Sequence, residues 1–91
     1  MKIRIDKSFD RDVDRIKNKK TLRKLQDIIS LIEKARSIHE IPHGKKIRGY
    51  TSLYRIRIGD YRMGIEVTSN DEAVLLRFLH RKEIYRYFPP R

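Results

Sequence analysis

The sequence predicts an α+β fold in which helices cover one face of an antiparallel sheet. Residues 22–32 carry apolar side chains at spacings of three and four, as a helix with one buried side does. Further along, apolar and charged residues alternate on both sides of Gly59-Asp60, which is typical of a β-hairpin. A chain of 91 residues has room for one hydrophobic core, so we expect a single domain over residues 1–91.

The helices are expected to come early in the chain, after one short strand. Apolar and basic side chains alternate over residues 1–6, which predicts that strand. Ser8 or Asp10 is expected to cap a first helix, and Thr21 a second, longer one. Together they would form a helical hairpin. The segment 41–44 holds a proline and a glycine, so we expect a turn there, followed by strands.

The later strands are expected at a short segment ending near residue 47, then at 53–58, 61–67 and 73–79. The segment 73–79 is almost continuously apolar, as in a strand with both faces covered. Its one charge, Arg77, is expected to be paired or to lie near an open face. The predicted architecture is therefore an N-terminal strand, a two-helix hairpin and a three- to four-stranded antiparallel sheet, ending in a short C-terminal helix or tail.

The charge of the chain favours a polyanionic partner, either nucleic acid or an acidic protein. Lys and Arg number 23 against 12 Asp and Glu, a formal net charge of +11. Self-repulsion among so many cations opposes compaction, which suggests that the charge is kept for binding. A solvated basic surface with no specific partner is the plainer interpretation.

The same composition excludes several classes of protein. Cysteine is absent, so no disulfide framework or thiolate metal site is possible. No apolar run approaches the roughly 18 residues of a membrane span, and no signal peptide is recognisable, so we expect a cytoplasmic protein without membrane contacts.

An alternating segment with several arginines is the strongest functional feature. Since successive strand side chains point to opposite faces, Arg55 and Arg57 are expected to project together while Ile56 and Ile58 pack inward. A guanidinium stays protonated and its planar fork pairs with two phosphate oxygens. Cleavage of RNA without a metal uses the ribose 2′-hydroxyl as nucleophile and needs such charge stabilisation together with proton transfer. The plainer interpretation is solvent-facing charge on a strand.

The candidate site residues fall into two sets. The candidate catalytic residues are Arg55, Arg57, Arg62, Arg81, Tyr85 and His80. The candidate RNA-binding residues are Lys45, Lys46, Arg48 and Lys82. His80 and Tyr85 are the candidates for proton transfer or base stacking, since imidazole titrates near pH 6.5 and a phenol near pH 10, each movable by neighbouring charge. The plainer interpretations are a partly buried strand histidine and a tyrosine that anchors the C-terminus.

We assign no metal and no cofactor. His39 and His43 lie four residues apart but on either side of Pro42, which is incompatible with ligand geometry on a helix. The acidic residues are dispersed, without the pairing that divalent cations need.

Three segments together resemble a known family: KIRG at 46–49, LYRIRIGDYR at 53–62 and LHRKEIYR at 79–86. They are similar to the RelE/ParE toxin superfamily of type II toxin–antitoxin systems, and to its RelE branch in particular. The resemblance extends over nearly the whole chain and implies a RelE-like fold. It also implies an mRNA interferase that enters the A site of the 70S-type ribosome and cuts the exposed codon, leaving a 2′,3′-cyclic phosphate and a 5′-hydroxyl.

The resemblance also implies a partner and residue roles. A cognate antitoxin would wrap the basic toxin, and mRNA in the ribosomal A site would be the substrate. Arg55 and Arg57 fall on two basic positions of the RelE pattern, and Arg62 on its phosphate-stabilising arginine. Arg81 and Tyr85 fall on its C-terminal arginine and tyrosine.

Two departures from the RelE pattern affect the assignment of roles. Where relatives have lysine at the first two basic positions this chain has arginine, a poor base, which directs attention to His80 or Tyr85. The spacing from Arg81 to Tyr85 is also shorter than in the RelE pattern. Two alternatives stay open: a ParE-like DNA gyrase inhibitor, against which the set of arginines argues, and a non-catalytic RNA-binding homologue.

Overall fold

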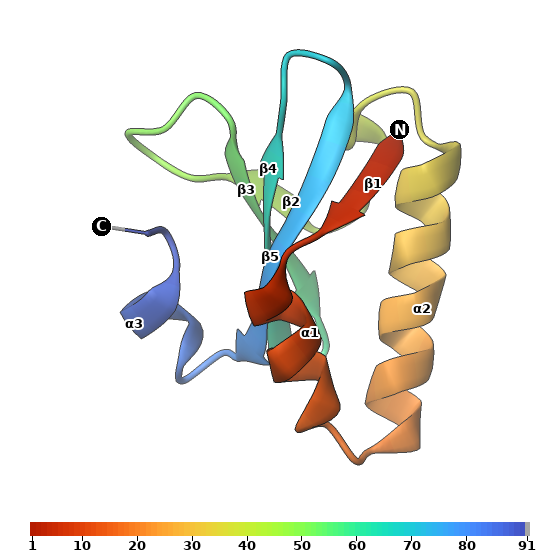
Figure 1. Ribbon diagram of the computed structural model, residues 1–91, viewed down its shortest axis with the longest axis vertical. Helices are drawn as coiled ribbons and strands as arrows, with labels where there is room; N and C mark the ends of the chain where they lie inside the picture. Colours follow the sequence, from red (N-terminus) through yellow and green to blue (C-terminus); the bar gives the residue numbers. More distant parts are fainter. Residues whose placement is uncertain (91) are drawn as a thin grey trace.

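A five-stranded mixed sheet forms the centre of the molecule (Figure 1). The computed structural model describes residues 1–90. The elements in chain order are β1 (Lys2–Ile5), α1 (Lys7–Asp14), α2 (Lys19–Lys34), the 3-10 turn η1 (Ile38–Glu40), β2 (Gly44–Lys46), β3 (Leu53–Ile58), β4 (Tyr61–Val67), β5 (Glu72–His80) and α3 (Ile84–Tyr87). The strand order is β1-β5-β4-β3-β2.

The predicted α+β class, the order of elements and the short C-terminal helix are confirmed. The sheet differs from the expectation in being mixed, because β1 runs parallel to β5 while the other neighbours are antiparallel. Both helix caps were predicted wrongly. Asp6 caps α1 by accepting from the Ser8 amide, and Asn18 caps α2 by accepting from the Thr21 amide at 3.1 Å.

The main core lies between α2 and one face of the sheet. Leu25 and Ile32 of α2 pack into one cluster with Ile56 of β3 and Phe78 of β5, all buried. The predicted inward position of Ile56 and Ile58 is confirmed by this cluster. Arg55 and Arg57 consequently point to the opposite face.

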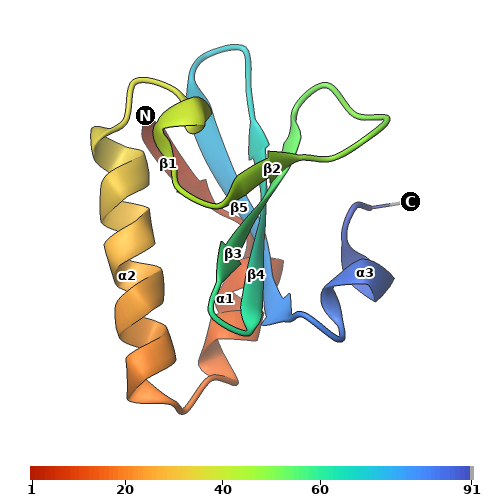
Figure 2. The same cartoon turned by 180° about the vertical axis from the view of Figure 1, so that it is seen from behind.

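That opposite face is partly covered, contrary to the expectation of an open face. The short helix α3 and the residue after it place Ile84 and Phe88 against Leu53 and Leu79 in a second buried cluster. Gly64 makes this packing possible, since a Cβ at that position would lie 2.7 Å from the Phe88 ring. The edge strand β2, whose place in the sheet Figure 2 shows, remains exposed along its whole length.

α1 completes the edge of β5 beyond the end of β1. The buried carboxylate of Asp12 accepts from the amide of Phe78 at 2.9 Å and from two nitrogens of Arg77, at 2.8 and 3.0 Å. The hydroxyl of Ser8 donates to the carbonyl of Leu76. Side chains of α1 thus satisfy strand groups that β1 is too short to reach. The expected pairing of Arg77 is confirmed. Within residues 1–90, no helix has the length and apolar character needed to cross a membrane.

Candidate active site

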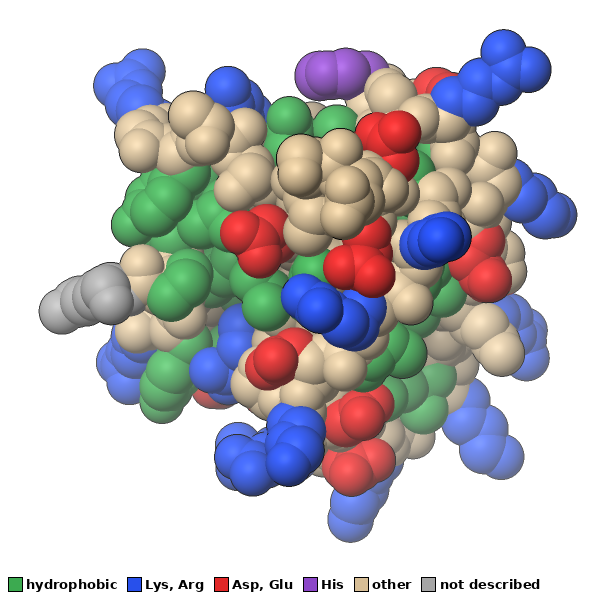
Figure 3. Space-filling model, turned by 45° about the horizontal axis from the view of Figure 1, so that its top comes forward, with side chains coloured by type: hydrophobic (Ala, Val, Ile, Leu, Met, Phe, Trp, Pro, Cys, Tyr) green, Lys and Arg blue, Asp and Glu red, His purple; other side chains and the backbone are tan. Residues whose placement is uncertain are grey.

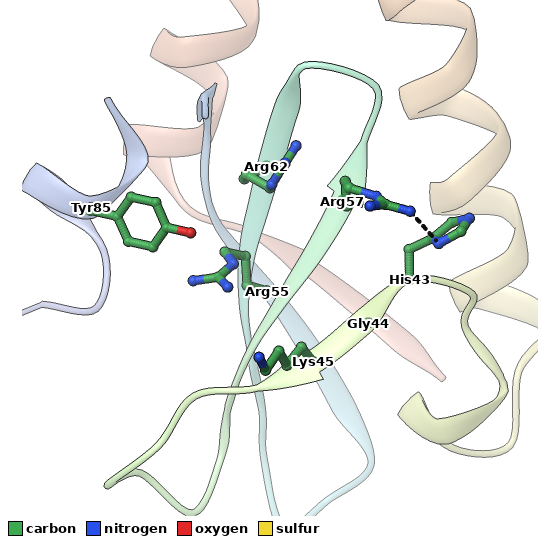
Figure 4. A pocket seen from close by; sticks show the side chains of 7 residues that line it. All are labelled: His43, Gly44, Lys45, Arg55, Arg57, Arg62 and Tyr85. Atoms are coloured by element: carbon green, nitrogen blue, oxygen red, sulfur yellow. Dashed lines mark hydrogen bonds between the residues drawn. The ribbon is translucent and has the colours of Figure 1, made fainter. Parts of the chain in front are cut away.

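Basic side chains surround a hollow on the face of the sheet that carries α3. Its volume is about 410 Å³. The residues that line it are His43, Gly44, Lys45, Arg55, Arg57, Arg62 and Tyr85, from β2 and the turn before it, β3, β4 and α3 (Figure 4). Within the described part of the chain, none of these lining residues is acidic. The hollow differs in this respect from the face of the molecule drawn in Figure 3, where acidic side chains lie among basic ones.

Strand register brings the cations together. Arg57 of β3 lies directly opposite Arg62 of β4, and Arg55 lies opposite Lys45 of β2. Directly opposed like charges destabilise a sheet, so this arrangement is costly unless an anion binds between them. A phosphodiester is an anion of suitable size and charge.

Protein contacts already orient the three guanidinium groups. Arg62 donates from Nη1 to the carbonyls of Gly59 and Tyr61, both at 2.9 Å. The guanidinium carbon of Arg55 lies 4.9 Å from the centre of the Tyr85 ring, in a cation–π contact. Groups held in this way lose little freedom when they bind phosphate, which favours stabilisation of a transition state.

Arg57 has a different partner, His43. Its Nη2 lies 3.2 Å from Nδ1 of the imidazole (Figure 4). The same two residues are joined through their backbones, since the Arg57 amide donates to the His43 carbonyl at 3.1 Å. Sequence reasoning considered His43 only as a metal ligand. The sequence did not predict that His43 lies in the site, because no short motif predicts the pairing of β2 with β3 across the intervening loop.

His80 lies away from the arginines, contrary to the expectation. It faces the α2 side, where its ring meets Tyr61 edge-on with centroids 5.6 Å apart, and its Nδ1 accepts from the Lys82 amide at 3.1 Å. It lines a separate hollow with Asn18 and Lys24. The cause is a bulge in β5: Gly64 pairs with Arg77 but Ile65 with Leu75, so one residue is skipped. The skipped residue reverses the alternation after it.

Of the remaining candidate site residues, some lie beside the hollow that Arg55, Arg57 and Arg62 line, and others lie away from it. Arg81 is exposed between β5 and α3, its amide donating to the Asp60 carbonyl at 2.8 Å, and it does not line the arginine hollow. Lys82 is exposed beside it. Lys45, Lys46 and Arg48 line a neighbouring hollow of about 500 Å³ that shares Arg55 and Tyr85 with the first. Within residues 1–90, no group of three or more His, Asp and Glu side chains could hold a metal ion.

The sequence and the fold of this chain match those of small toxins. The chain belongs to the family described as "ParE toxin of type II toxin-antitoxin system, parDE", whose model matches residues 3–85. The predicted membership of the RelE/ParE superfamily is confirmed by this match.

Within that family, the chain is similar to RelE proteins. It is 39% identical over 90 residues to Toxin RelE3 of Methanocaldococcus jannaschii, covering 98% of this chain and 100% of that protein. The toxin chain in the crystal structure of the RelB-RelE antitoxin-toxin complex from Methanococcus jannaschii matches with a TM-score of 0.81 and 37% identity, over 94% of this chain and 99% of that one. The archaeal RelE-RelB complex from Pyrococcus horikoshii OT3 shares the fold, with a TM-score of 0.69 at 23% identity over 88% of this chain and 93% of that one. The predicted RelE-like branch is confirmed by the first two.

Proposed function

We propose that this toxin is a metal-independent endoribonuclease that cuts mRNA in the ribosomal A site and so inhibits translation. The observation that carries the proposal is the hollow in which Arg55, Arg57 and Arg62 converge beside Tyr85. The similarity to RelE toxins supports it.

The arrangement suits attack by a ribose 2′-hydroxyl on the adjacent phosphorus. As the pentavalent phosphate forms, negative charge grows on its free oxygens, and guanidinium groups already in place stabilise that charge. Tyr85, with 61% of its surface exposed at the rim, supplies a hydroxyl and a ring on which a base can stack. The products would be a 2′,3′-cyclic phosphate and a 5′-hydroxyl. Lys45, Lys46 and Arg48 would hold the flanking phosphates.

We further propose a cognate antitoxin as the protein partner and the cytoplasm as the location. RelE relatives crystallise with a RelB antitoxin. A net charge of +11 favours an acidic segment that covers the hollow and competes with RNA.

Primer extension on an mRNA in a purified translation system tests the activity. Wild type should cut inside A-site codons only when ribosomes are present. Arg62→Ala should lose about 10²-fold or more in rate, because it removes a charge donor from the transition state. Arg23→Ala, an exposed arginine on α2, is the matched control and should cut normally. Full activity of Arg62→Ala would show that the site is misassigned.

The same assay decides the roles of Arg81 and His80, which remain predictions. Alanine at Arg81 lowers the rate if that side chain reaches the phosphate when ribosome-bound mRNA enters the site. Asparagine at His80 leaves the rate unchanged if its position on the α2 side persists.

Inhibition of DNA gyrase is a second candidate function, because the matching family model is described as ParE. A supercoiling assay at the concentrations that block translation distinguishes the two. We expect no inhibition of supercoiling. Inhibition without mRNA cleavage would establish the ParE-like activity, and binding of RNA without cleavage would indicate a non-catalytic homologue.

A further inference from the structure

The proposed reaction needs a group that accepts a proton, and the three arginines cannot serve. A guanidinium carries only donors and stays protonated at physiological pH. Of the other side chains lining the hollow, Lys45 is a cation and Tyr85 is a phenol. His43 is the remaining side chain that could accept a proton, and its contact with Arg57 identifies the ring nitrogen concerned.

Chemistry fixes the tautomer of His43. Because Arg57 can only donate, Nδ1 of His43 must be the acceptor of the 3.2 Å contact, and any ring proton lies on Nε2. In the free toxin the Nδ1 lone pair of His43 is therefore occupied by Arg57.

The backbone holds this imidazole in place. His43 has a φ of 61°, in the left-handed region that is uncommon for residues other than glycine and in which histidine is one of the more frequent of them. His43 lines the hollow immediately before β2 begins at Gly44, and the hydrogen bond from the Arg57 amide to its carbonyl holds its backbone there. An uncommon backbone conformation at a candidate site is a reason to look for a function.

We propose that His43 is the general base of the cleavage reaction, uncovered by the substrate itself; this inference rests on the proposed ribonuclease function. Arg57 pairs with the scissile phosphate and leaves His43, which frees the Nδ1 lone pair. Nδ1 takes the proton of the 2′-hydroxyl, the 2′ oxygen bonds to phosphorus, and the bond from phosphorus to the 5′ oxygen breaks. The 5′ oxygen departs with the bonding electrons and takes a proton from the Tyr85 hydroxyl. Water then returns a proton to Tyr85 and removes the one on His43.

Charged groups from four elements line the hollows that the imidazole also lines. They are Arg55 and Arg57 of β3, Arg62 of β4, Lys45 of β2, and Lys24 and Asp27 of α2, with the phenol of Tyr85 opposite. The cations around the imidazole outnumber the single carboxylate. The phosphate brings negative charge, which stabilises the imidazolium as the proton is transferred.

The test uses two variants that suit the backbone at this position. Asparagine and glycine both tolerate positive φ, so His43→Asn and His43→Gly should fold. His43→Asn keeps a side-chain oxygen that can accept from Arg57 but cannot take a proton. His39→Asn is the matched control, since that exposed histidine does not line the hollow. Thermal unfolding checks the fold of each variant.

Single-turnover cleavage of A-site mRNA on preformed ribosome complexes is measured across pH. For wild type and His39→Asn we expect the rate to fall on acidification, as a base is protonated. For His43→Asn we expect a loss of about 10²- to 10⁴-fold and no acidic limb. Added imidazole should restore part of the rate of His43→Gly.

The outcomes distinguish a failure of the role proposed for His43 from a failure of the proposed ribonuclease function. If His43→Asn cuts at the wild-type rate with the acidic limb intact, His43 only positions Arg57 and the inference is overturned. Loss of the acidic limb in His80→Asn instead would also overturn it. If wild type itself does not cut, the proposed function fails and this inference fails with it.

Discussion

Arg62 shows how one side chain can be fixed for its task before any substrate arrives. Its Nη1 donates to the carbonyls of Gly59 and Tyr61, both at 2.9 Å, which holds the planar fork at the turn between β3 and β4. Lysine has one nitrogen on a flexible stem and cannot both hold the turn and form a fork on phosphate.

We therefore predict that Arg62→Lys loses much of the activity that Arg62→Ala loses, although it keeps the charge. The expected loss in cleavage rate is on the order of 10²-fold. The same translation assay measures it, with Arg23→Lys as control. A wild-type rate for Arg62→Lys would show that charge alone suffices at this position.

Asp12 joins α1 to β5 through its buried carboxylate. It is 3% exposed and accepts from Arg77 twice and from the Phe78 amide. The hydrogen bonds from Arg77 to Asp12 raise the pKa of that guanidinium further, so the Arg77 side chain stays protonated.

We predict that Asp12→Ala lowers the free energy of unfolding by about 3 to 5 kcal/mol, because a partly buried guanidinium and a buried amide lose their partner. Urea unfolding measures this loss. In an Arg77→Met background the cost of Asp12→Ala should be smaller. An equal cost in both backgrounds would show that the ion pair contributes little.

At the scale of the elements, α3 is held over the sheet by a close approach. Phe88, 1% exposed, packs against Gly64 of β4 where no Cβ fits. Tyr85 lies on the same helix, so the seating of α3 also decides the position of the tyrosine above Arg55.

We predict that Gly64→Ala costs about 1 to 3 kcal/mol of stability, as overpacking of a buried site does, and lowers cleavage by shifting Tyr85. Unfolding and cleavage are measured together. Introducing Phe88→Ala should make room for the new methyl, so Gly64→Ala should cost less in that background. Additive effects of the two changes would contradict a direct clash.

The elements also mark where local pattern stops being informative. Alternation predicted the arginine face of β3 because successive side chains of any regular strand point to opposite faces, whatever the strand packs against. The position of His80 did not follow from local pattern, since the bulge near Leu76 shifts β5 by one residue against β4. Leu75 and Phe78 both lie in the α2 core, a spacing of three that a regular strand does not give. The sequence did not reveal this spacing, because Leu76 and Leu79 are also apolar and residues 73–79 therefore show no pattern of core-facing positions.

At the scale of the whole molecule, the excess of positive charge should make binding to RNA strongly dependent on salt. Each phosphate neutralised on a single strand contributes about −0.7 to the slope of log affinity against log salt concentration. We predict that Arg55→Ala makes this slope shallower by about 0.7 with single-stranded RNA. Fluorescence anisotropy at several salt concentrations measures it. The control Lys34→Ala, at the C-terminal end of α2, should leave the slope unchanged. Equal slopes for wild type and Arg55→Ala would show that Arg55 makes no phosphate contact.

The sequence by itself determined the α+β class, the arginine-bearing strand face and the resemblance to the RelE branch, because periodicity, turn chemistry and charge are properties of neighbouring residues. The tertiary structure alone decided which groups meet. It joined His43 to Arg57 by pairing β2 with β3, turned His80 away by a bulge, and buried Asp12 against β5. Each of these depends on register or packing between segments distant in the chain, where a shift of a single residue reverses the face to which a side chain points.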